Sequence, residues 1–414
     1  MNRFPTRVVA AAAAVLLAAG CSDSADDNGK GGPAAQEGST KPSQAAGQGL
    51  AIRPGKDLLA HQGVAVAALD RVTLQIRKQV TVPEPVAQGQ LAGTGSRSRV
   101  FDGSFRYALV GESGMGAQAP DGALTVADLN ATDGKAVVAM SREQMTAAGV
   151  TGTISGAQFS GSSAEPELWF QTTQADHPSG ETWSSSTAGQ YKITSLWSVN
   201  IKHWQAGHRT AQKHPVPADV QAYWKSQDCQ TAFSRSPGQE TFTPWSCWTV
   251  DAAGTPVASG PEDERTVSGT ADTGWTNPAS GTGTEKATFS YVKGSDGKPA
   301  LPLSVSGAGG NGTSTLDGMS GLIDSGSAAT SDRKMWRFTT EGSQLKLTEL
   351  PAALPAAAAA DGETELWAFP DGQAVAKAED GDTATGWILS ADGKWQKTGA
   401  WPADLQDAEV LTTA

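Results

Sequence analysis

The sequence has few of the residues from which metal and redox sites are built. Its 414 residues include three cysteines and five histidines, and charged residues make up 18% of the chain. A site made of several thiolate or imidazole ligands therefore has few candidate residues. The low charge also disfavours long solvated helices, and the abundant Gly, Ser and Thr favour short strands and turns.

Long hydrophobic runs are absent. The longest, Val8–Ala19, has about twelve residues, whereas a helix that spans a bilayer needs about 20. Arg3 and Arg7 precede this run, and small residues follow it. A positive head, a short apolar stretch and a small-residue end are typical of an export signal.

The end of that signal, Leu17-Ala18-Ala19-Gly20-Cys21, resembles the lipobox of bacterial lipoproteins. In that family the chain is cut before the cysteine, which is acylated, with palmitate for example, and becomes the first residue. The resemblance implies that residues 1–20 are a signal peptide and that lipid on Cys21 anchors the protein to the outer face of the cell membrane. Ala18 departs from the larger aliphatic residue that is usual there, and an ordinary secretion signal is the alternative.

Positive charge is also scarce. Removal of residues 1–20 takes away two of the 31 Lys and Arg, which leaves 29 against 43 Asp and Glu, a net charge of −14. That field repels a phosphate backbone, so we expect no nucleic-acid partner. With Cys21 assigned to lipid, Cys229 and Cys247 remain, and in an exported chain such a pair most simply forms a disulfide.

After Cys21, residues 22–50 have one bulky apolar side chain, that of Leu50. Such a segment buries too little surface to offset the entropy of ordering it. We therefore predict that residues 21–50 are a lipidated cysteine followed by a disordered linker. As a random coil, the linker reaches about 30 Å.

The remainder, residues 51–414, is predicted to be all-β. Apolar and polar residues alternate over Arg71–Val82, as in a strand with one buried face. Further short apolar runs are separated by Asp-Gly pairs, which tolerate the positive φ of tight hairpins. Helices are predicted from a capping box at Ser141–Gln144 and from helical spacing over Pro217–Gln227, and the alanine run 352–360 is either a connector or a third short helix.

A hairpin pattern recurs along the chain, in which a strand and an Asp or Asp-Gly turn precede a second strand. It occurs at Leu124–Val137, Thr249–Val257 and Trp387–Trp395, and it resembles the hairpins of β-propeller blades. We predict a propeller of six to eight blades, closed by the Arg71–Val82 strand, with two tandem β domains as the alternative.

Collinear matches also suggest a two-fold duplication, of about residues 85–225 and 270–410. Glu167-Leu168-Trp169, for example, returns as Glu365-Leu366-Trp367. Four further matches keep the same order at a near-constant offset, as expected of an internal repeat.

Three groups of residues are candidates for chemistry, and each has a simpler interpretation. His177, His203, His208 and His214 could ligate a metal, or form an exposed polar loop. The loops that begin at Asp272 and Asp324 resemble those of aspartic proteases, in which two carboxylates share a proton, but they also make good turns.

Tryptophan forms the third group, because all 13 lie at or after Trp169. Five crowd the cysteine pair and could form a sugar-binding platform or pack in a core; they are Trp183, Trp204, Trp224, Trp245 and Trp248. No Gly-x-Ser-x-Gly elbow or phosphate-binding loop is present. We therefore predict no catalytic, cofactor-binding or metal-binding residues.

These features predict a membrane-anchored, extracytoplasmic binding or accessory protein that is not an enzyme. Its partners are the membrane and a protein or glycan ligand at the cell surface. The alternative is a carbohydrate-binding or carbohydrate-active surface protein. A solute-binding component of a transporter is disfavoured, because that fold needs repeated βα units and the helices are missing.

Overall fold

The protein is described by a computed structural model, in which residues 1–43 and residues 44–414 form two units. All described residues belong to the second unit. They are 49–87, 100–111, 123–131, 137–160, 165–175, 191–225, 248–251, 253–258, 266–276, 284–293, 295, 304–307, 310–314, 320–325, 334–341, 344–354, 364–380 and 383–413.

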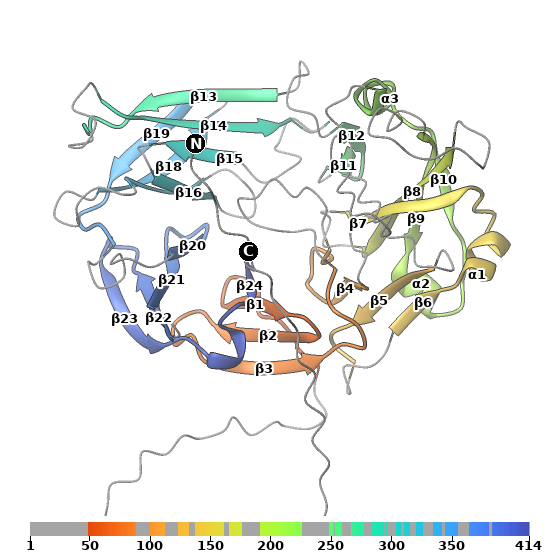
Figure 1. Cartoon of the computed structure of the whole chain (residues 1–414), viewed down its shortest axis with the longest axis horizontal. Helices are drawn as coiled ribbons and strands as arrows, with labels where there is room; N and C mark the ends of the chain where they lie inside the picture. The colour runs from red at the N-terminus through yellow and green to blue at the C-terminus, as the bar shows by residue number, and fades with distance from the viewer. Residues whose placement is uncertain are drawn as a thin grey trace, which may run out of the picture. The chain divides into compact units, whose positions relative to one another are not determined.

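The second unit consists of antiparallel sheets that follow one another like the blades of a propeller (Figure 1). The first sheet has the order β24-β1-β2-β3, with bounds Glu409–Thr412, Asp57–Gln62, Ala65–Asp70 and Ile76–Thr81. The second sheet has the order β4-β5-β6, with bounds Tyr107–Val110, Leu124–Asp128 and Val137–Met140. The third has the order β10-β9-β8-β7, with bounds Gln212–His214, Tyr191–Asn200, Glu167–Ala175 and Thr153–Phe159.

Three more sheets follow in the described part of the chain. The hairpin β11-β12 has bounds Trp248–Val250 and Pro256–Ala258. A seven-stranded sheet runs from β13 to β19, with bounds Thr266–Asp272, Lys286–Val292, Ser304–Gly307, Gly310–Ser314, Ser320–Asp324, Met335–Glu341 and Gln344–Glu349. The last sheet is β20-β21-β22-β23, with bounds Thr364–Ala368, Ala374–Asp380, Thr383–Leu389 and Trp395–Ala400.

The helices are few and short, and two were predicted. Helix α1 (Arg142–Ala147) has the capping box, in which Ser141 and Gln144 bond reciprocally. Helix α3 (Ala218–Lys225) begins directly after Pro217. Helix α2 (Ile201–Gln205), capped by Asn200, and the short 3₁₀ helix η2 (Ala403–Leu405) complete the set for the described residues. No helix in this part of the chain is both long and apolar enough to cross a membrane.

The ring is closed by a strand from the far end of the chain. Strand β24 pairs antiparallel with β1, with Leu58 opposite Thr412 and His61 opposite Glu409. The prediction that one terminus completes the sheet of the other is confirmed. The prediction that Arg71–Val82 is the closing strand is wrong, because the strand within it, β3, lies at the outer edge of the first sheet.

The alternating pattern of Arg71–Val82 predicted too long a strand, because the first part of this segment forms a turn. The Asp70 carboxylate accepts hydrogen bonds from the backbone nitrogens of Val72 and Thr73, both at 3.0 Å. Leu74 then adopts a φ of 55° and is buried, whereas Val72 is 64% exposed. Aspartate bonding to the backbone two and three residues ahead competes with the strand ladder, so only Ile76–Thr81 remains extended.

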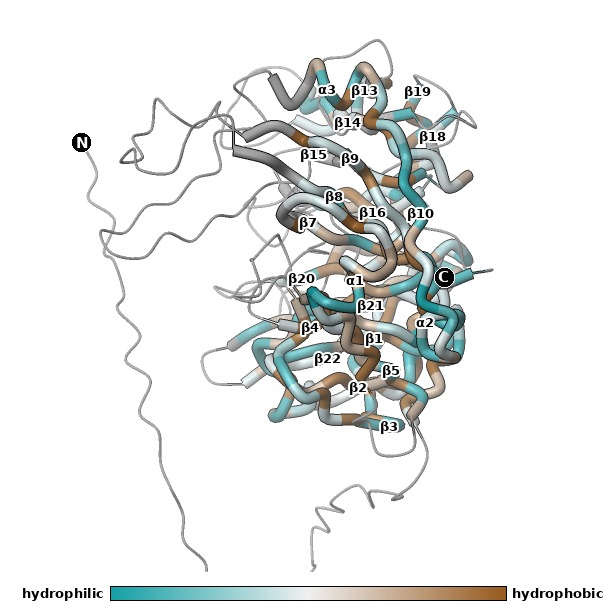
Figure 2. The backbone as a smooth tube through the Cα atoms, turned by 90° about the vertical axis from the view of Figure 1, so that its right-hand side faces the viewer, coloured by the Kyte–Doolittle hydropathy of each residue, from teal (hydrophilic) through white to brown (hydrophobic). Residues whose placement is uncertain are grey.

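Apolar packing joins neighbouring sheets around the ring. One core cluster spans the first three sheets, and another places Leu58 and Leu69 of the first sheet against Trp367 and Phe369 of the last. Side views show these apolar stretches alternating with hydrophilic ones, such as those along α2 and β10 (Figure 2). The chain is therefore an all-β protein of the β-propeller type, as predicted.

The seven-stranded sheet departs from a regular series of blades. Its outer strands, β13 and β19, contact each other, and Trp275, Phe289, Trp336 and Phe338 form a core of its own. The predicted hairpins are confirmed as β5-β6, β11-β12 and β22-β23. The two-fold duplication stays a prediction.

Candidate functional site

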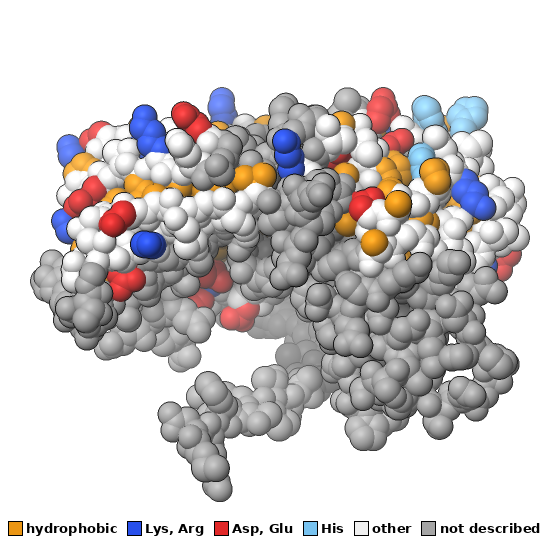
Figure 3. All heavy atoms as spheres, turned by 90° about the horizontal axis from the view of Figure 1, so that it is seen from above, with side chains coloured by type: hydrophobic (Ala, Val, Ile, Leu, Met, Phe, Trp, Pro, Cys, Tyr) orange, Lys and Arg blue, Asp and Glu red, His pale blue; other side chains and the backbone are white. Residues whose placement is uncertain are grey.

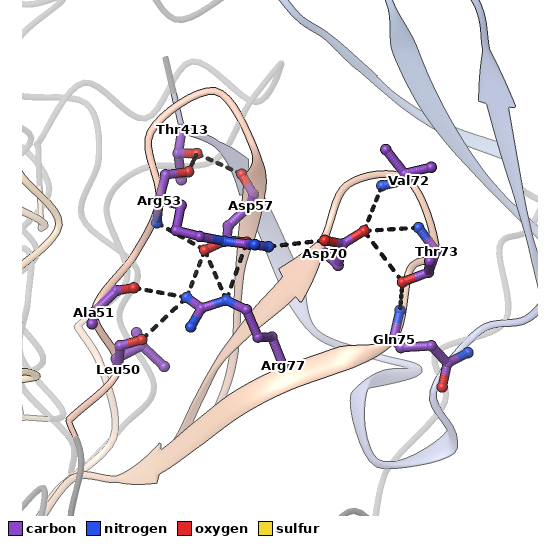
Figure 4. Close-up of polar contacts among 10 residues, drawn as sticks. All are labelled: Leu50, Ala51, Arg53, Asp57, Asp70, Val72, Thr73, Gln75, Arg77 and Thr413. Atoms are coloured by element: carbon purple, nitrogen blue, oxygen red, sulfur yellow. Dashed lines mark hydrogen bonds and ion pairs between the residues drawn. The ribbon is translucent and has the colours of Figure 1, made fainter.

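A network of charged residues lies where the two ends of the ring meet. We call Arg53, Asp57, Asp70, Arg77 and Thr413 the closure network (Figure 4). Asp57, at the start of β1, is fully buried. Its carboxylate accepts hydrogen bonds from the guanidinium groups of Arg53 and Arg77, each at 2.6 Å, and from the Arg53 backbone nitrogen at 2.8 Å.

The network joins both ends of the folded ring. Arg53 also donates to the Asp70 carboxylate at 2.8 Å, which ties the turn before β1 to the end of β2. The Gly55 nitrogen donates to the Thr413 carbonyl at 2.6 Å, just beyond β24. A buried carboxylate with two arginines is thus the point at which β1, β2, β3 and β24 are held together.

The same network holds residues 49–51, where the predicted linker ends. Arg77 donates to the Ala51 carbonyl at 2.7 Å, and Lys78 donates to the Gly49 carbonyl at 3.2 Å. The Leu50 nitrogen donates to Leu129 of the second sheet at 2.7 Å. A Cβ on Gly49 would overlap the Asn130 backbone, so only glycine fits this close approach. The chain is therefore fixed between the first and second sheets from residue 49 onward.

The arginines of the closure network keep its two aspartates ionised. Burial alone raises the pKa of Asp57, but the hydrogen bonds from Arg53 and Arg77 outweigh it and hold the pKa below its usual range. For Asp70, burial is likewise outweighed, by hydrogen bonds from Thr73, Arg53 and Val72, and its pKa is also lowered. Both carboxylates are thus ionised at every pH above the usual range for aspartate.

A second polar group lies on the face of the third sheet that packs against β11-β12. Ser198 Oγ lies 2.9 Å from His214 Nε2, and the His214 ring lies against Trp169, tilted by 31°, with 4.3 Å between the ring centroids. The Trp248 indole nitrogen donates to the Gln171 side chain at 2.6 Å. We call this set the aromatic cluster: Trp169, Gln171, Ser198, His214 and Trp248.

The Ser198–His214 pair has the two groups of a nucleophile and its base. Ser198 is 3% exposed, however, and Trp169 covers the imidazole ring, so Oγ does not face solvent. Burial lowers the pKa of His214, and the nearby Glu167 opposes this shift. A neutral histidine bonded to a buried serine joins β10 to β9 within the third sheet and lies against Trp169, which in turn contacts Trp248 of β11.

The predicted histidine group is not brought together. His203 lies in α2 and His208 just beyond it, both exposed, while His214 belongs to the aromatic cluster. Figure 3 shows histidine side chains exposed at one corner of the view. In the part of the chain that the structure describes, no three His, Cys, Asp or Glu side chains lie close enough to hold a metal ion. His177 lies outside the described residues.

The two aspartates of the protease-like loops are also apart. Asp272 ends β13 and Asp324 ends β17, and three strands separate them in the sheet. Asp272 accepts from Thr284 at 2.7 Å and from the Gly274 nitrogen at 2.8 Å, and these bonds lower its pKa. The simpler interpretation, a turn, is the one found for Asp272.

Of the five tryptophans near the cysteine pair, the two whose side chains the structure describes are buried in the core. Trp204 and Trp248 are 3% and 1% exposed. Trp183, Trp245 and the side chain of Trp224 lie outside the described residues, as do Cys21, Cys229 and Cys247. The closure network was missed by sequence reasoning. Its one signal was an aspartate, Asp57, directly before the apolar run Leu58–Ala60.

Comparison with known proteins gives little more than a general likeness. No family model and no curated protein matches the sequence. Among solved structures, TolB from Acinetobacter baumannii is 12% identical with a TM-score of 0.30, covering 86% of this chain and 65% of TolB. A putative 6-phosphogluconolactonase from Bacteroides fragilis is 10% identical with a TM-score of 0.28, covering 84% and 82%. AztD from Citrobacter koseri is 10% identical with a TM-score of 0.19, covering 82% and 68%. Similarity at this level says nothing about activity, and the propeller assignment rests on the sheets themselves.

Proposed function

We propose that this protein is a lipid-anchored, extracytoplasmic binding or accessory protein. Lipid on Cys21 holds it in the membrane, and residues 22–48 link the lipid to the ring. The observation that carries the proposal is the lipobox-like segment Leu17–Cys21, followed by a polar linker that ends at a fixed point of the fold. Hydrogen bonds from Arg77, Lys78 and Leu50 make that point, so the anchor attaches to two sheets at once.

The proposed binding role is supported by how the described polar side chains join the sheets. Asp57, Arg53 and Arg77 close the ring, and Gln171 bonds to Trp248 of the neighbouring hairpin. A ring held in this way is a rigid platform for a protein or glycan ligand at the cell surface. A disulfide between Cys229 and Cys247 forms part of this proposal and would add about 3 kcal/mol of stability by the chain-entropy account.

The anchor is tested by replacing Cys21 with Ala and, as a matched control, Ser22 with Ala. We expect the Ser22→Ala protein to stay in the membrane fraction with an acylated N-terminal peptide, as in the wild type. The Cys21→Ala protein should be released or left unprocessed, because the thiol is the site of acylation. Membrane retention of a correctly cleaved Cys21→Ala protein would overturn the anchor.

A further inference from the structure

Two exposed valines mark the two opposite ends of strand β2. They are the exposed large hydrophobic residues in the part of the chain that is described: Val72 at 64% and Val64 at 40%. Val64 lies in the β1-β2 turn and Val72 in the β2-β3 turn. Six residues of extended chain separate the turns, a distance of about 20 Å. The two valines therefore report on opposite ends of the first sheet, along its strands.

The Val72 turn is on the side where the linker attaches. The Arg71 nitrogen donates to the Lys56 carbonyl at 3.0 Å, so this turn lies directly beside the turn that precedes β1. Arg53, within that turn, bonds to Asp70 at the start of the Val72 turn. We call this side, formed by residues 53–57 and 70–75, the linker face. Residues 49–51 are held beside it by Arg77, which also bonds to Asp57.

The Val72 turn is rigid and locally neutral. Asp70 fixes it through the backbone of Val72 and Thr73, and Leu74 anchors it from below, where it is 1% exposed. Asp70 is paired with Arg53, and Asp371 of the neighbouring β20-β21 turn is paired with Arg71 at 2.8 Å. An apolar tip surrounded by neutralised acids suits a lipid surface, whereas the chain's net negative charge would otherwise disfavour one.

The linker is short compared with the ring. Twenty-seven residues separate Cys21 from Gly49, and a random coil of that length spans about 30 Å on average. The linker joins the ring at the linker face, and the Val64 turn lies about 20 Å from that face along β2. We propose that the linker face rests on the bilayer that holds Cys21, with Val72 at the lipid interface. This inference rests on the proposed function.

The test uses the full lipidated chain in phosphatidylcholine vesicles that carry a quencher on the lipid headgroup. A small fluorescent amino acid is placed at position 72 or, as the matched control, at position 64. Both sites are exposed and lie in turns of the same sheet, so neither change disturbs a core. We expect most of the fluorescence at position 72 to be lost and that at position 64 to be largely kept.

Flotation of the vesicles distinguishes the two levels of the proposal. If the protein floats and quenching is equal at the two positions, or stronger at 64, the orientation is wrong and the anchor stands. If the protein does not float with the vesicles, the anchor falls and the orientation falls with it. The Cys21→Ala protein mixed with the same vesicles should show no quenching at either position.

Discussion

The closure network and the aromatic cluster both join segments that are far apart in the sequence, but they do so with opposite chemistry. In the closure network, the buried Asp57 carboxylate forms ion pairs with two arginines. In the second, neutral groups meet, as where the Trp248 indole bonds to Gln171. Loss of one partner from a buried ion pair leaves an uncompensated charge, whereas loss of a neutral partner leaves only an unpaired dipole. We therefore expect a substitution in the closure network to lower the free energy of unfolding more than one in the aromatic cluster.

The largest effect is expected from Asp57→Asn. The change keeps the size of the side chain but removes the charge that Arg53 and Arg77 share, so Arg77 loses its ion pair and Arg53 keeps only Asp70. This should lower the free energy of unfolding by about 3 kcal/mol. Urea unfolding of the chain that also carries Cys21→Ala measures this loss. The control is Asp371→Asn, since Asp371 is 46% exposed and its pair with Arg71 should contribute at most about 1 kcal/mol. Equal losses in the two variants would contradict the ranking.

A smaller effect is expected from Gln171→Leu in the aromatic cluster. The variant fills a similar volume but leaves the buried Trp248 indole nitrogen without its acceptor at 2.6 Å, at a cost of about 1–3 kcal/mol. Urea unfolding followed by tryptophan fluorescence measures it. Gln212→Leu, at an exposed site in β10 of the same sheet, is the control and should change little. A loss as large as that of Asp57→Asn would show that charge does not set the difference.

The smallest expected effect is on the pH dependence of stability, which differs between the closure network and the aromatic cluster. His214 has a lowered pKa in the folded protein, so the unfolded chain binds its proton first as pH falls. The stability that His214 contributes is complete above about pH 6.5 and is lost as pH falls from there towards its folded pKa. Asp57 and Asp70 also have lowered pKa values, so their contribution persists down to about pH 4 and is lost below it.

Unfolding measured from pH 7 to pH 3 tests this order. His214→Phe should remove the decline near pH 6 and leave the decline at lower pH in place. Asp57→Asn should leave the decline near pH 6 in place and reduce the decline at lower pH, where Asp70 still contributes. If His214→Phe leaves the pH profile unchanged down to pH 4, the histidine is not the group that weakens first.

Features that depend on neighbouring residues could be predicted from the sequence. Features that depend on pairing between distant segments could not. The capping box at Ser141–Gln144 and the β22-β23 hairpin, with Gly393 at a φ of 82°, need only neighbouring residues. The closing strand β24 has four residues, and its identity depends on a partner at the other end of the chain. Apolar alternation over Arg71–Val82 could not show that the Asp70 side chain would divert the backbone into a turn.

The candidate site was harder to predict for the same reason. Arg53, Asp57 and Arg77 are ordinary charged residues in sequence, separated by 4 and 20 positions. Only the pairing of β1 with its neighbours brings them onto one buried carboxylate. The tryptophan-rich stretch attracted functional interpretation because the residue is rare, yet its described members, Trp204 and Trp248, are buried in the core.

The position of β24 has a consequence for how the protein reaches its native state. Thr413 and Asp57, which bond across the seam, are 356 residues apart, so the first sheet to be synthesised is completed only by a strand made much later. A contact between such distant residues carries a large loop-closure entropy and forms late. Until β24 is present, β1 therefore keeps an unpaired strand edge, which is the form most prone to mispairing and to proteolysis. Pairing of β24 with β1 is the event that completes the first sheet.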